Sequence, residues 1–368
     1  MEFALNRSIR KWVSLSAFLG FAVFLFYLYF FTDIEGVVSV IGGTNLPFYS
    51  LAFICVLGSV AFNALAWHRL LSTLSLKVSY RMVFNLSWVG IFVDAIIPGG
   101  WSGDAFKAYL LSRDPNVDGG KAASSIVVKN VLELFLTLGI SVLGLILLAL
   151  NYTLEGGVLI TVGITMLLLT APLIIIIYFS INTNATKKVL RAFKRLAAFI
   201  RRHPSNMNEF EARIEKPLKE YHDGLTTLRK NTKALIQPAI FQTLAWSFDL
   251  FALFFIFASI GYIVPLDKII ITNTIAANLH TQGVALAGFA QLVSLNIYNI
   301  LSIPPPISGA STVLAGFASF WFKTIIAFFA FQSVVFSRCI PPFCLHASGL
   351  RGKSRKDEKL LVQSNSDK

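Results

Sequence analysis

Long uninterrupted apolar runs are the feature that most restricts the fold of this 368-residue chain. A helix needs about 20 apolar residues to cross roughly 30 Å of hydrocarbon. Runs of about this length or longer lie at residues 13–31, 48–66, 125–150, 157–180, 234–261 and 312–336. In hydrocarbon, backbone N–H and C=O groups can form hydrogen bonds only with each other, so such runs are expected to be helical. The sequence therefore predicts an all-α fold, a polytopic transmembrane helical bundle with about six full spans.

Composition supports a membrane protein and argues against a nucleic-acid partner. Charged residues make up only 14% of the chain, against about 25% in soluble domains. The net charge of +13 comes from Lys and Arg crowded into a few loops, which is the pattern that orients membrane proteins. The three cysteines show no disulfide or zinc spacing. We therefore expect no nucleic-acid binding, no metal site and no cofactor.

Charge asymmetry predicts the topology. Basic residues precede the first run and fill the tail, so both termini of this multi-pass protein are expected on the cytoplasmic side of the cell membrane. Residues 181–233 hold thirteen Lys or Arg against five acids, and we expect a basic cytoplasmic loop there. Within it, residues 186–202 have the spacing of a basic amphipathic helix. Such a helix suits either an anionic lipid surface or a solvated linker.

Two further apolar segments are interrupted, and each is expected to form a broken helical hairpin. Residues 82–111 have basic residues at both ends, so this segment is predicted to be re-entrant, turning back at residues 98–100. Residues 269–309 begin and end on the outer face and are broken near Gln282 and Gly288, with two full spans as the alternative. Irregular backbone at membrane depth survives only where protein or a wet cavity surrounds it.

These features divide the chain into four parts. The parts are a first transmembrane half (1–180), the basic loop (181–233), a second transmembrane half (234–337) and a disordered basic cytoplasmic tail (338–368). The two broken segments open from opposite faces. Inverted repeats with discontinuous helices are a recurrent plan of transporters, and the pattern allows such a repeat here.

The break at residues 98–100 is a candidate site for a phosphate-bearing lipid head group. A helix that restarts after the break directs free N–H groups and the positive end of its dipole toward it. Pro-Gly-Gly alone is more often a plain turn, so the charges beside it carry the prediction. Asp104, three residues before Lys107, is placed to orient that ammonium or to meet the lipid. The predicted head-group residues are Pro98, Gly99, Gly100, Gly103, Asp104, Lys107 and Arg113.

Polar residues inside other apolar runs form a candidate supporting network. Lys129, Asp249 and Lys323 all lie within such runs. The alternative for each is local pairing or a side chain that reaches the interface. Asp249 fits that alternative least, because its own run has no base nearby. The supporting residues are Asp94, Tyr109, Glu133, Asp249 and Gln291, and His280 and Gln282 flank the second break. No residue is assigned a catalytic role.

The stretches IIPGGWSGDAFKAYLLSR (96–113) and GGKAASSIVVKNVLELF (119–135) resemble the lysylphosphatidylglycerol synthase transmembrane family of flippase-like membrane proteins. Members tend to show Pro-Gly-Gly-x-x-Gly-Asp-x-x-Arg-x-Tyr-x-Leu, and here Lys107 replaces the usual Arg. A Glu-Arg pair of the family appears as Lys129-Asn130. In the second half, GFAQLVSLNIYNILSIPPPISGASTVLAGFASFWF (288–322) is similar to the family pattern, with Gln291 where Glu is common and Gly316 where Arg is common.

The resemblance implies translocation of anionic or phosphate-bearing lipids between leaflets, or binding of them, with membrane lipids as partners. One alternative is a membrane-embedded glycosyl- or lipid-transferase acting on a polyprenyl-phosphate-linked substrate. Another is a membrane scaffold whose basic loop docks a soluble enzyme. The tail after residue 336 has about thirty residues, so we expect no fused catalytic domain. The sequence has no phosphate-binding P-loop motif, and non-enzymatic transport is the favoured interpretation.

Cysteine accessibility tests the first hairpin. Single cysteines at Ser79 and Pro115, in a chain without the three native cysteines, flank residues 82–111. Both should react with a membrane-impermeant maleimide from the same face, because a segment that turns back does not cross. Reaction from opposite faces would show that this segment spans the membrane.

Overall fold

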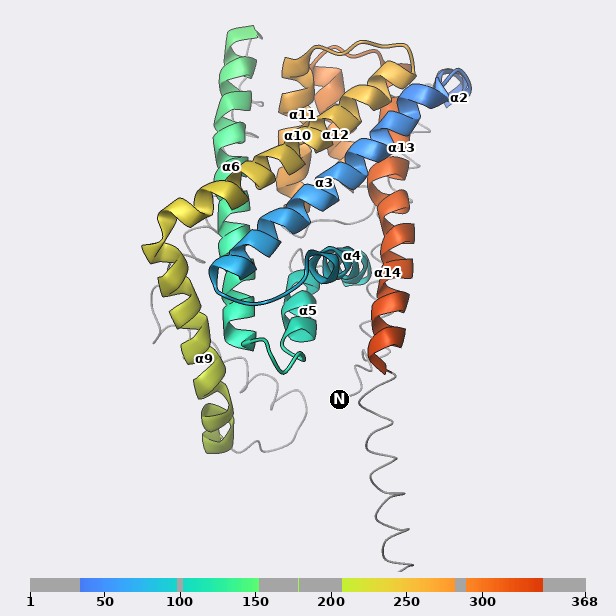
Figure 1. Cartoon of the computed structure of the whole chain (residues 1–368). Helices are drawn as coiled ribbons and strands as arrows, with labels where there is room; N and C mark the ends of the chain where they lie inside the picture. The colour runs from blue at the N-terminus through green and yellow to red at the C-terminus, as the bar shows by residue number, and fades with distance from the viewer. Residues whose placement is uncertain (1–33, 98–101, 152–177, 179–206, 282–288, 340–368) are drawn as a thin grey trace, which may run out of the picture.

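The computed structural model describes residues 34–97, 102–151, 178, 207–281 and 289–339 (Figure 1). Every regular element in these ranges is helical, which confirms the all-α prediction. The elements are α2 (Ile34–Gly42), α3 (Leu46–Thr73), α4 (Tyr80–Ile96), α5 (Ser102–Leu111), α6 (Gly119–Asn151), α9 (Met207–Lys230), η1 (Thr232–Leu235), α10 (Ile236–Ser259), α11 (Leu266–Thr281), α12 (Phe289–Ile300), α13 (Pro305–Gly316), η2 (Phe317–Trp321) and α14 (Phe322–Cys339).

Within the described ranges, four helical stretches are long and apolar enough to span a membrane. They are Leu46–Thr73, Gly119–Gly144, Thr232–Ser259 and Pro305–Val334, and they correspond to four of the six predicted runs. The other two runs, 13–31 and 157–180, lie outside the described residues except for Tyr178. Large apolar side chains remain exposed on these stretches, including Phe135 at 52%, Phe251 at 50% and Phe329 at 66%. An apolar exterior of this kind suits contact with lipid.

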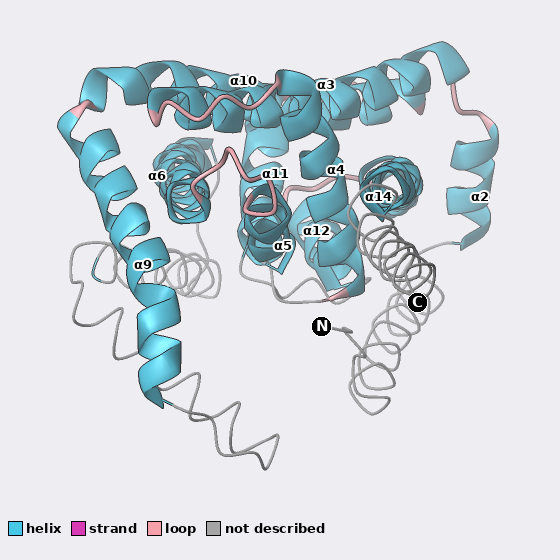
Figure 2. Cartoon of the chain, turned by 60° about the horizontal axis from the view of Figure 1, so that its bottom comes forward, coloured by secondary structure: helices cyan, strands magenta, loops and turns pink. Residues whose placement is uncertain are grey.

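Helices α3 and α10 lie side by side and cross the molecule together (Figure 1). Below them, α4 and α5 lie between α6 and α14, with α4 packed on α14 and α5 packed on α6. At the other end of the molecule, α11 and α12 pack on each other, and α11 also packs on α6 and α10 (Figure 2). The short helices of the hairpins are thus enclosed by the long ones, and α4 and α5 are brought against α6 from the first half and α14 from the second.

Three helices end in the same backbone turn. The residue after the C-cap has a positive φ in each, 59° at Ser75, 75° at Gly261 and 56° at Ser302. The next N–H then bonds back to the carbonyl of the last turn, as in a Schellman motif. These bonds join Leu76 N to Leu71 O, Tyr262 N to Phe257 O and Ile303 N to Tyr298 O. Leu76, Val264 and Ile303, at or near these turns, are buried, so each helix end also contributes to the apolar core.

The predicted break in the first hairpin is present as two separate helices. Helix α4 ends at Ile96, α5 begins at Ser102, and the two pack against each other. A Cβ on Gly103 would lie 2.2 Å from the Gly90 carbonyl oxygen, so the two backbones touch where they meet. Residues 98–101 lie outside the described residues. That the hairpin turns back inside the membrane stays a prediction.

In the second interrupted segment, helix α11 and helix α12 border residues 282–288, which lie outside the described residues. The choice between a broken segment and two full spans therefore stays a prediction. Pro305 begins α13, where its missing N–H costs no hydrogen bond. That helix continues through the π-helical turn η2 into α14.

Helix α9 is a feature that the sequence analysis missed inside the expected basic loop. It packs along α6, and its residues Leu218 and Leu228 are buried, at 7% and 1% exposure. The Gly120 N–H donates to Glu220 Oε2 across this contact at 3.3 Å. Apolar residues spaced along one face of an otherwise charged segment were the available signal. The amphipathic helix expected at 186–202 lies outside the described residues.

Replacing Gly120 tests how closely α9 packs on α6. A Cβ at Gly120 would lie 2.2 Å from the Pro217 carbonyl oxygen and 2.7 Å from the Tyr221 nitrogen, both backbone atoms. Gly120→Ala should therefore cost about 1–3 kcal/mol through overpacking. Gly139→Ala, on the same helix with nothing within 4 Å of its Cβ, should be neutral or stabilising by up to about 1 kcal/mol. Thermal unfolding of the detergent-purified variants gives the comparison, and equal midpoints would contradict the close contact.

Candidate functional site

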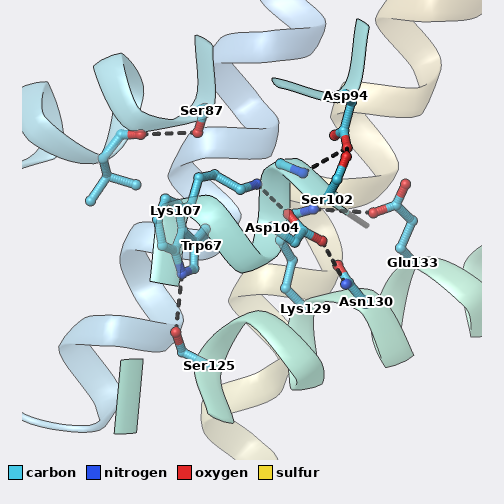
Figure 3. Close-up of polar contacts among 12 residues, drawn as sticks. Trp67, Ser87, Asp94, Ser102, Asp104, Lys107, Ser125, Lys129, Asn130 and Glu133 are labelled. Carbon is cyan, nitrogen blue, oxygen red and sulfur yellow. Dashed lines mark hydrogen bonds and ion pairs between the residues drawn. The ribbon is translucent and has the colours of Figure 1, made fainter. Parts of the chain in front are cut away.

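Asp94, at the end of α4, caps the start of α5. Its Oδ1 accepts hydrogen bonds from the Gly103 N–H and the Ser102 hydroxyl, both at 2.7 Å (Figure 3). The sequence analysis expected free amide groups here for an external anion. The structure instead places one of the protein's own carboxylates at the positive end of the helix, where a negative charge is stabilised. This contact explains why an acidic residue, Asp94, lies beside a site that was predicted to bind an anion.

Asp104 and Lys107 form an ion pair inside the bundle, one turn into α5. The Asn130 amide of α6 donates to Asp104 Oδ2 at 2.6 Å, and the Lys107 ammonium lies 5.2 Å from the Trp67 ring centroid. The carboxylate therefore neutralises the lysine that was expected to meet a phosphate.

Lys129 and Glu133 form a second pair on α6, at 3.2 Å. They are four residues apart, which places both side chains on one face of the helix. The Lys129 side chain is only 8% exposed, whereas that of Glu133 is 32% exposed. The pair is therefore buried at its lysine and open at its carboxylate.

Asp249 and Lys323 form a third pair, which joins α10 to α14. Lys323 Nζ lies 3.9 Å from Asp249 Oδ1, at the limit of an ion pair. The sequence analysis found no base near Asp249 on its own run. The base comes from another helix, and it lies two residues beyond the π-helical turn η2. Such turns are frequent at functional sites because they change the direction of the side chains that follow.

These charged residues surround a cavity of about 270 Å³, which we call the charged chamber. Helices α3, α4, α5, α6, α10 and α14 all contribute to its wall. Its ionisable lining residues are Asp94, Asp104, Lys107, Lys129, Glu133, Asp249 and Lys323. Charges enclosed in a membrane bundle are costly and usually mark a pathway or a binding site.

A second cavity of about 490 Å³ adjoins the first, and we call it the neutral chamber. Its further lining mixes apolar side chains such as Leu136, Trp246 and Leu253 with uncharged polar ones such as Gln291 and Thr312. We call the residues that line both chambers the neck. The neck consists of Ser59, Asn63, Glu133, Asp249 and Lys323.

Six of the nine predicted site residues that the structure describes line these chambers. Asp94, Asp104, Lys107, Glu133 and Asp249 line the charged chamber, and Gln291 lines the neutral one. The three residues of the Pro-Gly-Gly turn, 98–100, lie outside the described residues.

Tyr109 and Arg113 differ from the expectation. They line neither chamber, and each is exposed. The Arg113 guanidinium bonds the Tyr109 hydroxyl and lies 4.8 Å from its ring centroid. Arg113 follows the end of α5, so the helix directs its side chain away from the cavity that Lys107 faces.

The sequence analysis missed the polar residues that α3 supplies. Ser59 and Asn63 are four residues apart and share one face of a long apolar helix. Paired polar residues at helical spacing inside a span were the signal that could have identified them. Trp67, one turn further along, carries the ring beside Lys107 and donates to Ser125 Oγ at 3.0 Å.

Gln291 and Gly316 lie together in space. A Cβ on Gly316 would be 3.6 Å from Gln291 Nε2, although the two residues belong to different helices, α12 and α13. The resemblance places a Glu and an Arg at these positions in other members. In this chain, one uncharged contact occupies the place that the resemblance gives to a charge pair.

A model of the lysylphosphatidylglycerol synthase TM region matches residues 17–327 of this chain. The chain belongs to this family. It is similar to a UPF0104 membrane protein of Methanocaldococcus jannaschii, 27% identical over 317 residues, which are 84% of this chain and 91% of the relative. A UPF0104 membrane protein of Pyrococcus horikoshii is 23% identical over 311 residues, 81% of this chain and 90% of the relative. No solved structure matches the chain.

This member of the lysylphosphatidylglycerol synthase TM region family is a multi-pass membrane protein, and the resemblance seen in its motifs is confirmed. Its Gly103, Asp104 and Lys107 lie in the motif that carried the resemblance, and they fold against Asp94 and Asn130. The family motif is therefore part of the wall of the charged chamber.

Replacing Asp104 tests the buried pair that this family motif provides. Asp104→Asn would leave the Lys107 ammonium buried without a counter-charge, which should cost about 3–5 kcal/mol of unfolding free energy. Asp118→Asn is the matched control: Asp118 and Lys121 have the same spacing of three residues but are 46% and 35% exposed, so the loss should be about 0–1 kcal/mol. Asp104→Asn combined with Lys107→Met should recover most of the loss in thermal unfolding. Equal losses in the two Asp→Asn variants would contradict a buried pair.

Proposed function

We propose that this protein binds a phosphate-bearing membrane lipid in its two adjoining chambers and moves the head group between leaflets. The observation that carries the proposal is the charged chamber, enclosed in a helical bundle whose outer surface is apolar. Such a cavity provides a head group with polar partners at a depth where lipid tails provide none.

The cost of the charges supports a functional role. Four carboxylates and three lysines line one cavity of about 270 Å³. Buried ion pairs usually stabilise a protein no better than well-packed apolar residues of similar size. Stability therefore gives little reason to place seven ionisable groups together, whereas binding of a charged ligand does.

The two chambers together match an amphiphile. The charged chamber suits the head group, and the neutral chamber, with Leu136, Trp246 and Leu253 in its wall, suits the part of the lipid next to it. Ligand sites in proteins commonly combine an apolar wall with a few placed polar groups. The neck joins the two environments, as the lipid itself joins a polar end to an apolar one.

Interrupted helices provide a means of movement. The charged chamber is lined by α4 and α5, on either side of the first expected break, and Gln291 of the neutral chamber lies on α12, after the second expected break. In many transporters, discontinuous helices line the site and rock around it to expose one face at a time. The π-helical turn before Lys323 adds a third irregular element beside the neck.

Blocking the neck without changing charge tests this function. Purified protein in liposomes should accelerate the loss of leaflet asymmetry of fluorescent phosphatidylglycerol and phosphatidylethanolamine. Ser59→Trp fills the neck and should slow this exchange at least about tenfold, a difference of roughly 1.4 kcal/mol in barrier height. Ser50→Trp is the control, because Ser50 lies on the same helix and is exposed away from both chambers.

Probes that keep their asymmetry with wild-type protein present would contradict transport. Chemical alteration of a probe when a polyprenyl-phosphate donor is added would support the transferase alternative instead. A cellular phenotype that survives Ser59→Trp but is lost on deletion of residues 181–206, which leaves α9 in place, would support the scaffold.

A further inference from the structure

We infer that the neck binds a head group that carries both a phosphate and an ammonium group, that is, the head of a zwitterionic phospholipid. This inference rests on the proposed function and refines it, since the proposal names only a phosphate-bearing lipid. It follows from which charges in the chambers a ligand can reach, and from their balance.

Two of the three chamber lysines are closed to a ligand. The side chains of Lys107 and Lys129 are 9% and 8% exposed, and each contacts its own carboxylate, Asp104 and Glu133. Lys107 is also covered by the Trp67 ring. Little of either side chain is therefore left for a phosphate to contact.

The charges that a ligand can reach lie in the neck. Asp249 is 39% exposed, Glu133 is 32% exposed and Lys323 is 22% exposed. The Asp249–Lys323 distance of 3.9 Å is well beyond the roughly 2.7–2.9 Å of a direct charge-assisted hydrogen bond. This pair therefore leaves hydrogen-bonding capacity on both partners.

The neck has more accessible negative than positive charge. Among the described residues that line both chambers, two carboxylates, Glu133 and Asp249, accompany one ammonium, Lys323. A head group with phosphate alone would be attracted by Lys323 and repelled by Asp249, and also by Glu133, whose charge Lys129 compensates in part. This balance disfavours it in a site of low dielectric. A head group that adds an ammonium turns those repulsions into attractions.

The positions of the three groups give the bound head an orientation. The phosphate would meet Lys323 on α14, and the ammonium would meet Asp249 on α10 and Glu133 on α6. Ser59 and Asn63, the uncharged members of the neck, both lie on α3 and provide hydrogen-bonding groups between these helices. The glycerol and the chains would then extend along the neutral chamber.

Binding of two matched probes tests this selectivity. Dioctanoyl phosphatidylethanolamine carries both charges, and dioctanoyl phosphatidylglycerol carries the phosphate alone. The full-length protein, purified in detergent, should bind the ethanolamine lipid at least about tenfold more tightly in native mass spectrometry, as expected when a charged hydrogen bond distinguishes two ligands. Equal binding, or preference for the glycerol lipid, would overturn the inference. This comparison uses the wild-type protein alone.

Changing the charge balance of the neck should change the preference. Asp249→Asn leaves one carboxylate and one ammonium, and it should lower the preference by about tenfold. Asn63→Lys adds a second ammonium and should also lower the preference. This variant tests the charge balance if the Asp249→Asn protein is not produced in folded form. Asp118→Asn removes a carboxylate outside both chambers and should leave the preference unchanged. A preference that neither neck variant alters would contradict the assignment to the neck.

The same probes separate this inference from the proposed transport. Selective binding without movement in liposomes would support the zwitterionic site and contradict translocation. Movement of both lipids at the same rate, without selective binding, would support translocation and contradict the zwitterionic site. Absence of binding by either probe would overturn the inference.

Discussion

The buried Asp104–Lys107 pair is the contact on which the rest of the structure depends. Through it, α5 is held against three other helices: Asn130 of α6 bonds the aspartate, Trp67 of α3 covers the lysine, and Gly90 of α4 leaves room for the lysine side chain. An unpaired charge at this depth would be far too costly to keep. The requirement that each buried charge has a partner therefore fixes how the hairpin packs into the bundle.

The same requirement explains the gradient of charge along the cavity. Asp94 accepts hydrogen bonds at the start of α5, and Lys107 and Lys129 are paired with their carboxylates. Toward the neck the pairing becomes looser, until Asp249 and Lys323 stand 3.9 Å apart and are both partly exposed. Tight pairs support the wall, and the loose pair is the one that a ligand can enter. Structure and function are thus served by different members of one network.

Much of this organisation could be predicted from the sequence. The apolar runs predicted the helices, because hydrocarbon leaves the backbone few other structures. The Pro and Gly residues at 98–100 predicted that one helix ends and another begins there, as α4 and α5 do. The sequence analysis identified Asp94, Asp104, Lys107 and Glu133, because a charge inside an apolar segment is energetically costly and usually has a functional role. Helix α9 was missed because its apolar face is narrow and its charge dominated the interpretation. Arg113 was placed in the site by its closeness in sequence, although α5 turns its side chain away.

By itself, the sequence determined that this chain is a helical membrane protein with charges at interrupted segments. Both results come from local properties, namely the length of apolar runs and the position of helix-breaking residues. Only the tertiary structure decided which charges meet. Asp249 and Lys323 are far apart in the chain, and Gln291 and Gly316 lie on different helices, so no spacing rule relates them. Their proximity depends on how the helices pack. The sequence of a helix fixes the direction of its own side chains, but it does not fix which other helices lie beside it.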